Sequence, residues 1–377
     1  MTAIALRASA KRPSALRRLD KRWWVLFAAF IVGGIYEVID NILGLRLLNF
    51  ESSAPPIVKV AKEAAIIWLL LGLIRRNGFP RLTAFGATIL SVVLLCSLPL
   101  LFDLPSASFA MAGLIYYMIS LGMLLATCAL IRPQDSADFA RHFVLPIILA
   151  ILVTQCLEIA FAPASLYNET NLFGLDRRAG IAAIPTTAGL LGVVGVATLR
   201  GVPRLLSLAV IGLASSSVSL ACLAIVWVSR IRRPVYALAI VPAIAVAFGA
   251  AIASREGLDV SANARLDILS DSIQHLTLFG PSDFGALTTA KSVALSPTDS
   301  YIIDSMYLEA FHIFGIIPGT VLLLALFTTI YRRVGGVATM LFALTGIGYL
   351  AVEAWIVWIA ILFAFQQRPA RRGRVRH

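Results

Sequence analysis

The chain has 377 residues, of which 59% are hydrophobic and 14% are charged, and its formal net charge is +12. About a quarter of the residues in an ordinary soluble domain are charged, so this composition excludes a soluble globular protein. The basic residues cluster in short segments beside apolar runs, a distribution that sets membrane orientation rather than nucleic-acid binding. We therefore expect a membrane protein with no nucleic-acid partner.

Apolar stretches of roughly 17 to 25 residues recur between Trp23 and Phe365, and a helix of ~20 residues crosses the ~30 Å hydrocarbon core of a bilayer. The runs are continuous and lack two-residue alternation, which excludes a membrane barrel and leaves helices. The predicted fold is all-α, a polytopic membrane bundle of about 12 transmembrane helices that form a single domain over residues 23–365.

The first half of the chain divides into five spans if its basic N-terminal segment, residues 1–22, lies in the cytoplasm. The apolar run that follows is long and has no small-residue cleavage site, so we expect a retained span rather than a removed signal peptide. The five predicted spans are Trp23–Ile39, Ile57–Ile74, Leu82–Phe102, Ala107–Ile131 and Phe143–Phe161. An extracytoplasmic polar loop, residues 162–179, follows the fifth span.

Two later apolar runs are each expected to form two short spans. The polar segment Ser215–Ser219 interrupts the run from Leu205 to Val228, and splitting this run keeps the arginines that follow it in the cytoplasm. The last run, Val337 to Phe365, is expected to split near Gly348–Glu353, which keeps the basic tail, residues 366–377, inside. Treating both runs as single helices lowers the count to about 10.

The remaining predicted spans are Gly180–Leu199, Tyr236–Ser254 and one that begins after Asp304. The longest polar segment, residues 255–301, then lies between spans 9 and 10 as an extracytoplasmic loop. Both termini lie in the cytoplasm. If residues 205–228 form a single helix, this loop moves to the cytoplasmic side and is separated from the first polar loop.

The polar residues do not form a familiar phosphate-binding, metal-binding or nucleophile motif. The four histidines include no close pair, and the four cysteines lie in apolar runs without the paired spacing of a disulfide or zinc site. These residues are His142, His275, His312, His377, Cys96, Cys128, Cys156 and Cys222. We expect no metal and no cofactor, so any chemistry must use Arg, Asp and Glu.

Three polar segments stand out on the predicted extracytoplasmic side: residues 176–189, 261–285 and 304–319. The first has paired arginines at the entrance of a span. The second has an arginine before a short stretch of helical apolar spacing, and the third has an aspartate before a run with further polar residues. The residues concerned are Arg177, Arg178, Arg265, Asp304, Tyr307, Glu309 and His312.

Arginine is always charged and has a forked guanidinium, so it is suited to holding phosphate oxygens, including those of a lipid-borne pyrophosphate. A carboxylate beside such arginines can act as a general base toward a sugar hydroxyl. Structural roles are also open: arginines at span ends often anchor a helix at the interface, an aspartate before an apolar run often caps a helix, and polar residues within a span often bond other helices. The occurrence of three such segments in one chain favours a functional site over these structural roles.

In these segments the sequence resembles the O-antigen polymerase and O-antigen ligase superfamily, which includes exopolysaccharide polymerases. Arg178-Ala179-Gly180 with Pro185-Thr186 is similar to the family's Arg-x-Gly segment and the Pro that follows it. Arg265, followed by a stretch that ends at Leu278-Phe279-Gly280, is similar to a second arginine before a short helix. Residues 304–308 take the place of a His-Asn-x-Tyr-Leu segment. Two features of this sequence depart from the family pattern. The family's Ser-Arg pair is absent from residues 215–219. An Asp-Ser pair replaces His-Asn, and this replacement favours the polymerase-like branches of the family over the ligases.

The resemblance implies a metal-independent glycosyltransferase of the bacterial inner membrane. It would transfer a growing glycan from undecaprenyl pyrophosphate to a lipid-linked repeat unit at the periplasmic face, and a chain-length regulator protein is a further candidate partner. Arg178 and Arg265 would hold the pyrophosphate, and Asp304 would deprotonate or orient the acceptor hydroxyl. The second-tier candidates for substrate binding are Arg177, Tyr307, Glu309 and His312.

Other classes remain open alongside this one. An O-antigen ligase-type glycan transferase would use the same donor. A lipid-linked sugar flippase or transporter is favoured by charged residues near or inside apolar runs. These residues are Glu37, Lys59, Lys62, Glu63, Glu158 and Glu353. A membrane scaffold would tolerate substitution of the loop arginines.

Overall fold

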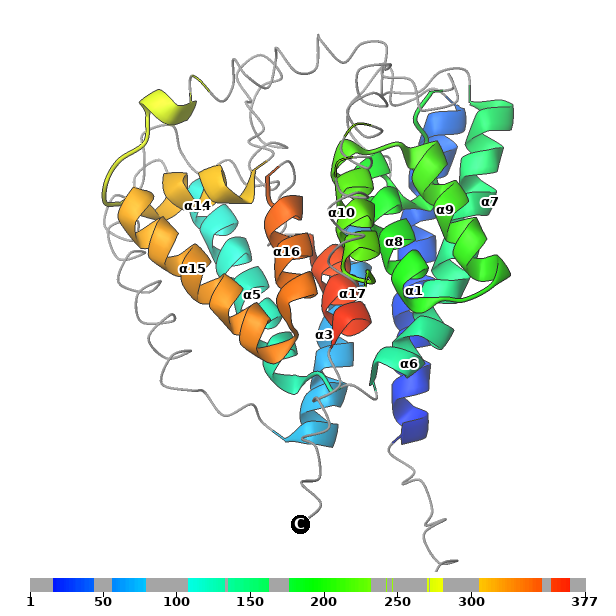
Figure 1. Ribbon diagram of the computed structural model, residues 1–377, viewed down its shortest axis with the longest axis horizontal. Coiled ribbons are helices and arrows are strands. Elements are labelled where there is room, and N and C mark those ends of the chain that lie inside the picture. Colours follow the sequence, from blue (N-terminus) through cyan, green and yellow to red (C-terminus); the bar gives the residue numbers. More distant parts are fainter. Residues whose placement is uncertain are drawn as a thin grey trace, which may run out of the picture.

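The computed structural model of the protein describes residues 16–43, 56–78, 108–132, 135–162, 176–231, 242, 246, 270, 272–280, 305–347 and 354–366. Every regular element in this part of the chain is helical (Figure 1), which confirms the predicted all-α class for these residues. The span predicted at residues 82–102 lies outside the described residues, and so do Arg265 and Asp304. Only residues 242 and 246 of the span predicted at 236–254 are described.

The first group of helices packs α1 against α3 and α7. Residues 135–161 form one continuous helical stretch that contains a π-helical turn. The elements are α1 (Leu16–Ile42), α3 (Pro56–Asn77), α5 (Ser108–Leu130), α6 (Asp135–Phe139), η2 (Ala140–Val144), α7 (Leu145–Phe161), η3 (Gly180–Ala182), α8 (Pro185–Thr198), α9 (Val202–Ala214), α10 (Ser217–Val228), α14 (Met306–Phe314), α15 (Ile316–Arg333), α16 (Gly336–Thr345) and α17 (Trp355–Phe365).

Three helical stretches in the described residues are long and apolar enough to cross a membrane: Lys21–Ile42, Asp135–Phe161 and Ile316–Arg333. They support membrane association. Other apolar helices are shorter, such as α8 with 14 residues and α9 with 13. At roughly 1.5 Å per residue these two are about 20 Å long, less than the ~30 Å hydrocarbon core. The total of about 12 spans therefore stays a prediction.

The run from Leu205 to Val228 is broken into two helices, as its polar interruption predicts. Ser215 takes a left-handed backbone conformation, with φ of 42°, between α9 and α10. α8 packs against both helices. α10 runs parallel to α8, since Arg230, just after α10, donates to the Val196 carbonyl near the end of α8 at 3.1 Å. α9 runs antiparallel to α8, since Gly192 lies against Ile211 and Gly195 against Ser207, and it is therefore antiparallel to α10 as well.

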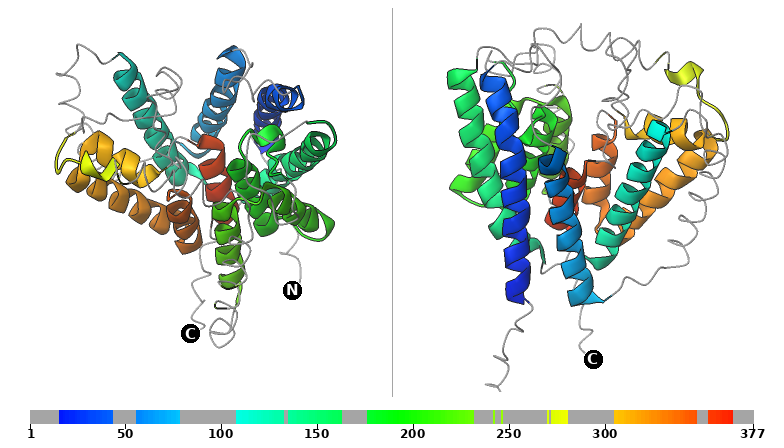
Figure 2. Two further views of the ribbon diagram at one scale, coloured as in Figure 1. Left: turned by 90° about the horizontal axis from the view of Figure 1, so that it is seen from above. Right: turned by 180° about the vertical axis from the view of Figure 1, so that it is seen from behind.

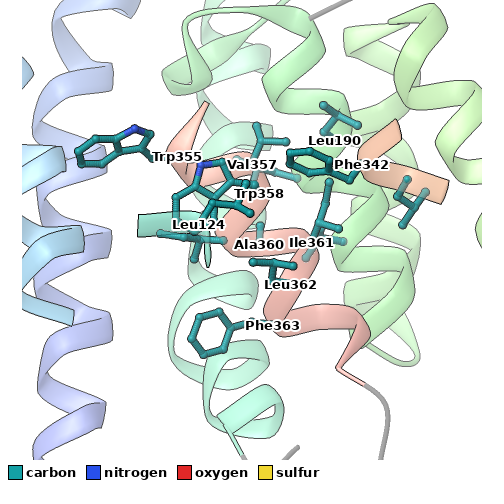
Figure 3. Close-up of a cluster of buried hydrophobic side chains, with 14 of the residues drawn as sticks. Leu124, Leu190, Phe342, Trp355, Val357, Trp358, Ala360, Ile361, Leu362 and Phe363 are labelled. Atoms are coloured by element: carbon teal, nitrogen blue, oxygen red, sulfur yellow. The ribbon is translucent and has the colours of Figure 1, made fainter. Parts of the chain in front are cut away.

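The hydrophobic core surrounds α17, which lies at the centre of the bundle (Figure 2). A helix that is apolar on every face must be shielded from water by protein or lipid, and here protein does so, since Trp358 and Phe363 are fully buried within the cluster shown in Figure 3. Phe363 meets Trp23 of α1 edge-on, with ring centroids 4.8 Å apart. The Trp355 indole N–H donates to Ser120 Oγ of α5 at 2.6 Å, which satisfies a polar group inside the core.

A buried ion pair links α3 to α6 where α5 ends. Arg76 and Asp135 are 2.8 Å apart, with side chains 11% and 0% exposed, and the second carboxylate oxygen accepts the Arg132 N–H at 2.9 Å. We expect Asp135→Ala to lower the free energy of unfolding by about 3 kcal/mol, because the Arg76 guanidinium loses its buried partner. Thermal unfolding of the purified protein in detergent measures this loss. The exposed neighbour Arg75 provides the control, Arg75→Ala, and equal melting temperatures for the two variants would contradict the prediction.

Candidate functional site

Residues 176–184 form an irregular segment between α7 and α8, and its central residues, 178–182, are buried. Ile181 lies against Gly34 of α1, where any Cβ would collide with the Ile181 carbonyl. Gly34 is about two turns before the end of α1, so the segment lies well inside the bundle. Irregular backbone at such depth needs hydrogen-bond partners within the protein. The first is Thr154 Oγ1 of α7, which accepts the Ile181 N–H at 3.0 Å.

Two further side chains of α7 hold the same segment. Gln155 donates its amide N–H to the Arg178 carbonyl at 2.8 Å. Glu158 accepts the Gly180 N–H at 3.0 Å with one carboxylate oxygen and the side-chain amide of Asn41 at 2.8 Å with the other. Glu158 is 1% exposed and Gln155 is fully buried. These contacts fix the backbone around Arg178 to α1 and α7.

Arg178 is a buried cation whose side chain is only partly paired. The residue is 8% exposed, and its backbone N–H donates to the Leu213 carbonyl of α9 at 3.1 Å. One terminal nitrogen lies 3.4 Å from Asp176, whose side chain is 41% exposed, while Nε has no hydrogen-bond partner among the described residues. A buried donor without an acceptor costs about 1–3 kcal/mol. The guanidinium can therefore accept an anionic ligand without breaking a strong internal contact.

Arg177, the other arginine of the pair, points to the end of α9. Its Nε donates to the Ala214 carbonyl at 3.2 Å. Cations are favoured at helix C-termini, where the last carbonyls lack helical partners. This contact gives Arg177 a structural role beside the predicted substrate contact, and it fixes the turn at the end of α9.

Of the predicted polar residues of α14, Glu309 and His312 are buried and Tyr307 is half-buried, and all three make contacts within the protein. The Tyr307 hydroxyl donates to the Ala343 carbonyl of α16 at 2.8 Å. His312 Nε2 lies 2.5 Å from Ser272 Oγ, and both residues are fully buried. Glu309, one turn before His312, is 1% exposed. These contacts position α14 against α16 and the loop that precedes it, and a role in substrate binding stays a prediction.

A chain of contacts connects the Arg178 segment with α14 at one end of the bundle. Arg177 holds the end of α9 at Ala214, and α10 starts three positions later, at Ser217. Cys222 of α10 lies 3.8 Å from the Thr345 hydroxyl of α16. Just beyond α16, the Gly346 carbonyl accepts the Met306 N–H of α14 at 2.9 Å. The first and third polar segments of the sequence thus lie at the same end, joined through the α9–α10 turn and the end of α16.

Sequence reasoning did not assign the supporting residues Asn41 and Gln155, and it considered Glu158 only as part of a transport path. A signal was present, because Gln155 and Glu158 are polar residues three positions apart inside an apolar helix. Such residues usually face the interior of a bundle. Their partners lie in the segment after α7. The partner of Glu158 is the Gly180 N–H, 22 residues further along, and sequence spacing does not identify such a partner.

Comparisons with known proteins gave no matching family model, no matching curated protein and no matching solved structure. Among the described residues, no group of three or more His, Cys, Asp or Glu side chains has the arrangement of a metal site.

Proposed function

We propose that the protein is a polysaccharide polymerase that transfers a growing glycan from undecaprenyl pyrophosphate to a lipid-linked repeat unit. The observation that supports this proposal most is Arg178, a buried guanidinium on a rigidly held segment, whose Nε finds no hydrogen-bond partner in the part of the chain that the structure describes. Pyrophosphate offers several charged oxygens, and arginine binds such oxygens with paired, charge-assisted hydrogen bonds. The substrate is lipid-borne, which agrees with a binding residue inside a membrane bundle.

The proposed reaction is a displacement at the anomeric carbon of the donor sugar. The acceptor hydroxyl oxygen forms the new bond to that carbon, the bond to the pyrophosphate oxygen breaks, and the electron pair leaves with the pyrophosphate. Arg178 stabilises the charge that develops on the leaving group. The sequence adds Arg265 to this role and Asp304 as the base that takes the acceptor proton. Pyrophosphate is already a good leaving group, so the scheme requires no metal.

The proposed location is the inner membrane of a bacterium, with both termini in the cytoplasm and the site at the periplasmic face. The excess of arginine at the ends of α3 and α15 supports this orientation, because positive residues favour the cytoplasmic side. The Arg178 segment and α14 lie at the other end of these helices, since α15 runs away from α14 toward its two terminal arginines.

The proposal is tested in cells that need this protein to make surface or secreted polysaccharide. Arg178→Ala, Arg265→Ala and Asp304→Ala are each expressed in a deletion strain, and glycan chain length is measured at matched protein levels. We expect single repeat units to replace long chains in all three. Arg200→Ala is the control, because Arg200 is exposed and lies at the opposite end of α8. Normal chain lengths in all three test variants would disprove the assignment.

A flippase or transporter is the second candidate, and one observation favours it. The side chain of Lys62 in α3 lies against Gly33 of α1, where a Cβ would be 3.3 Å from Lys62 Cε. Glu37 and the buried Asp40 follow on the same face of α1. Ionisable groups between membrane helices often mark transport paths. Deletion of the gene distinguishes the two candidates. Lipid-linked repeat units accumulate at the periplasmic face of the inner membrane if the protein is a polymerase, and at the cytoplasmic face if it is a flippase.

A further inference from the structure

A second segment, residues 277–280, packs onto the junction of α14 and α15. The Thr277 and Leu278 carbonyls accept the N–H groups of Ile316 and Ile317 at 2.9 and 3.2 Å. These two N–H groups belong to the first turn of α15, which has no acceptors within its own helix. The contact is therefore a cap on α15, made by a distant part of the chain.

The remaining backbone contacts of this segment are also internal. The Gly280 N–H donates to the Phe314 carbonyl at 3.0 Å, and Thr277 Oγ1 donates to the Gly280 carbonyl at 2.7 Å. Gly315 permits the close approach: its φ is +88°, and a Cβ there would lie 2.7 Å from Phe279 Cα. The segment thus satisfies much of its backbone without water, which is the condition for irregular backbone at membrane depth.

The two large side chains of this segment, Leu278 and Phe279, are apolar and exposed. Leu278 is 62% exposed and Phe279 is 68% exposed. The segment lies at the outer edge of the bundle, beside α14 and α15, in Figure 1 and in both views of Figure 2. α15 is one of the stretches long and apolar enough to span the membrane, and it exposes Ile317, Val321 and Leu324 along one face, at 44%, 47% and 61%. Leu278 is bonded to Ile317 through the backbone, so its exposed surface continues this face.

We infer that residues 277–280 insert into the membrane interface and that Leu278 and Phe279 contact lipid acyl chains. Two large exposed apolar side chains next to a lipid-facing helix are stabilised by removal from water. This inference refines the sequence-based expectation that residues 255–301 form a wholly extracytoplasmic loop. It is independent of the proposed function, because it rests only on α15 being a membrane helix.

The test uses the full-length protein in liposomes, with Cys156→Ser to remove the thiol that is exposed among the described residues and Cys96→Ser to remove the thiol that lies outside them. In Phe279→Cys the new thiol carries an environment-sensitive NBD probe. Gln274→Cys, at an exposed polar position three residues before the segment, is the matched control. We expect the probe at 279 to be quenched by spin-labelled lipids and protected several-fold from aqueous iodide relative to the probe at 274. Equal iodide access at both positions, or no quenching by spin-labelled lipids at 279, would overturn the inference.

A second variant tests the backbone docking. Gly315→Ala places a methyl group against Phe279 Cα, so we expect it to release the segment and expose the probe at 279 to iodide. Size-exclusion chromatography establishes that this variant remains folded. If Gly315→Ala unfolds the protein, the comparison of positions 279 and 274 in the otherwise unchanged chain still decides the inference. A folded Gly315→Ala protein with unchanged quenching would show that docking on α15 does not hold the segment in the membrane.

Discussion

Arg178→Ala is expected to lower the rate of glycan polymerisation by about 100-fold or more, the usual effect of removing one donor that stabilises transition-state charge. The fold should survive, because the contacts that anchor this segment use the Arg178 backbone: Gln155 bonds its carbonyl and Leu213 bonds its N–H. The side chain adds the 3.4 Å pair with the half-exposed Asp176, which is worth little in stability, and lies near the Glu158 carboxylate, whose bonds to Gly180 and Asn41 remain in the variant. The rate is measured in membrane vesicles supplied with lipid-linked repeat units.

Two variants make this expectation specific. Arg178→Lys keeps the charge but loses the fork that binds two phosphate oxygens, so we expect it to recover only a small part of the rate. Arg200→Ala removes an exposed arginine at the far end of α8 and should leave the rate unchanged. A normal rate for Arg178→Ala at a normal protein level would disprove the role of this residue. An equal loss in Arg200→Ala would attribute the effect to total charge instead.

Glu158→Ala is expected to lower the free energy of unfolding by about 3 kcal/mol, the largest stability loss at the site. The substitution leaves the Gly180 N–H and the Asn41 amide buried without their acceptor, and each such orphan costs about 1–3 kcal/mol. It also removes the negative charge that lies near Arg178. Thermal unfolding in detergent measures the effect, and Glu158→Gln, which keeps an acceptor oxygen, should lose less.

The control for this prediction is Val153→Ala on the same helix. Val153 is 58% exposed and lies on the outer surface of α7, so its truncation removes little buried area. We expect its melting temperature to stay near that of the unmodified protein. A Glu158→Ala protein as stable as Val153→Ala would show that the carboxylate does not support the Arg178 segment.

Several parts of the fold could be predicted from the sequence because their signals are local. Residues 355–365 are apolar on all faces, and such a stretch is expected to form a helix shielded from water, as α17 is. The serines at 215–219 interrupt an apolar run, and the chain breaks there. Arg177 and Arg178 stood out because charge is rare in this sequence, and Arg178 proved to be the buried cation of the site.

Helix length within an apolar run was not predictable in the same way. A run of about 20 apolar residues satisfies the hydropathy criterion for a span, but within the predicted span Gly180–Leu199 the helix α8 has only 14 residues. The difference arises because neighbouring helices can bury irregular backbone, as they do for residues 178–182. Hydropathy indicates that a residue avoids water, but it does not indicate whether lipid or protein surrounds that residue.

The membrane character and the two arginines between the fifth and sixth predicted spans were determined by the sequence alone, because composition and rare charges are visible without any partner. Only the tertiary structure decided what holds those arginines. Asn41 and Glu158 are 117 positions apart, and Gly34 contacts Ile181 across a similar separation. No periodicity connects such distant positions, because their meeting depends on how α1 and α7 pack. The sequence supplied the cation, and the packing of two helices places it at a fixed depth in the bundle.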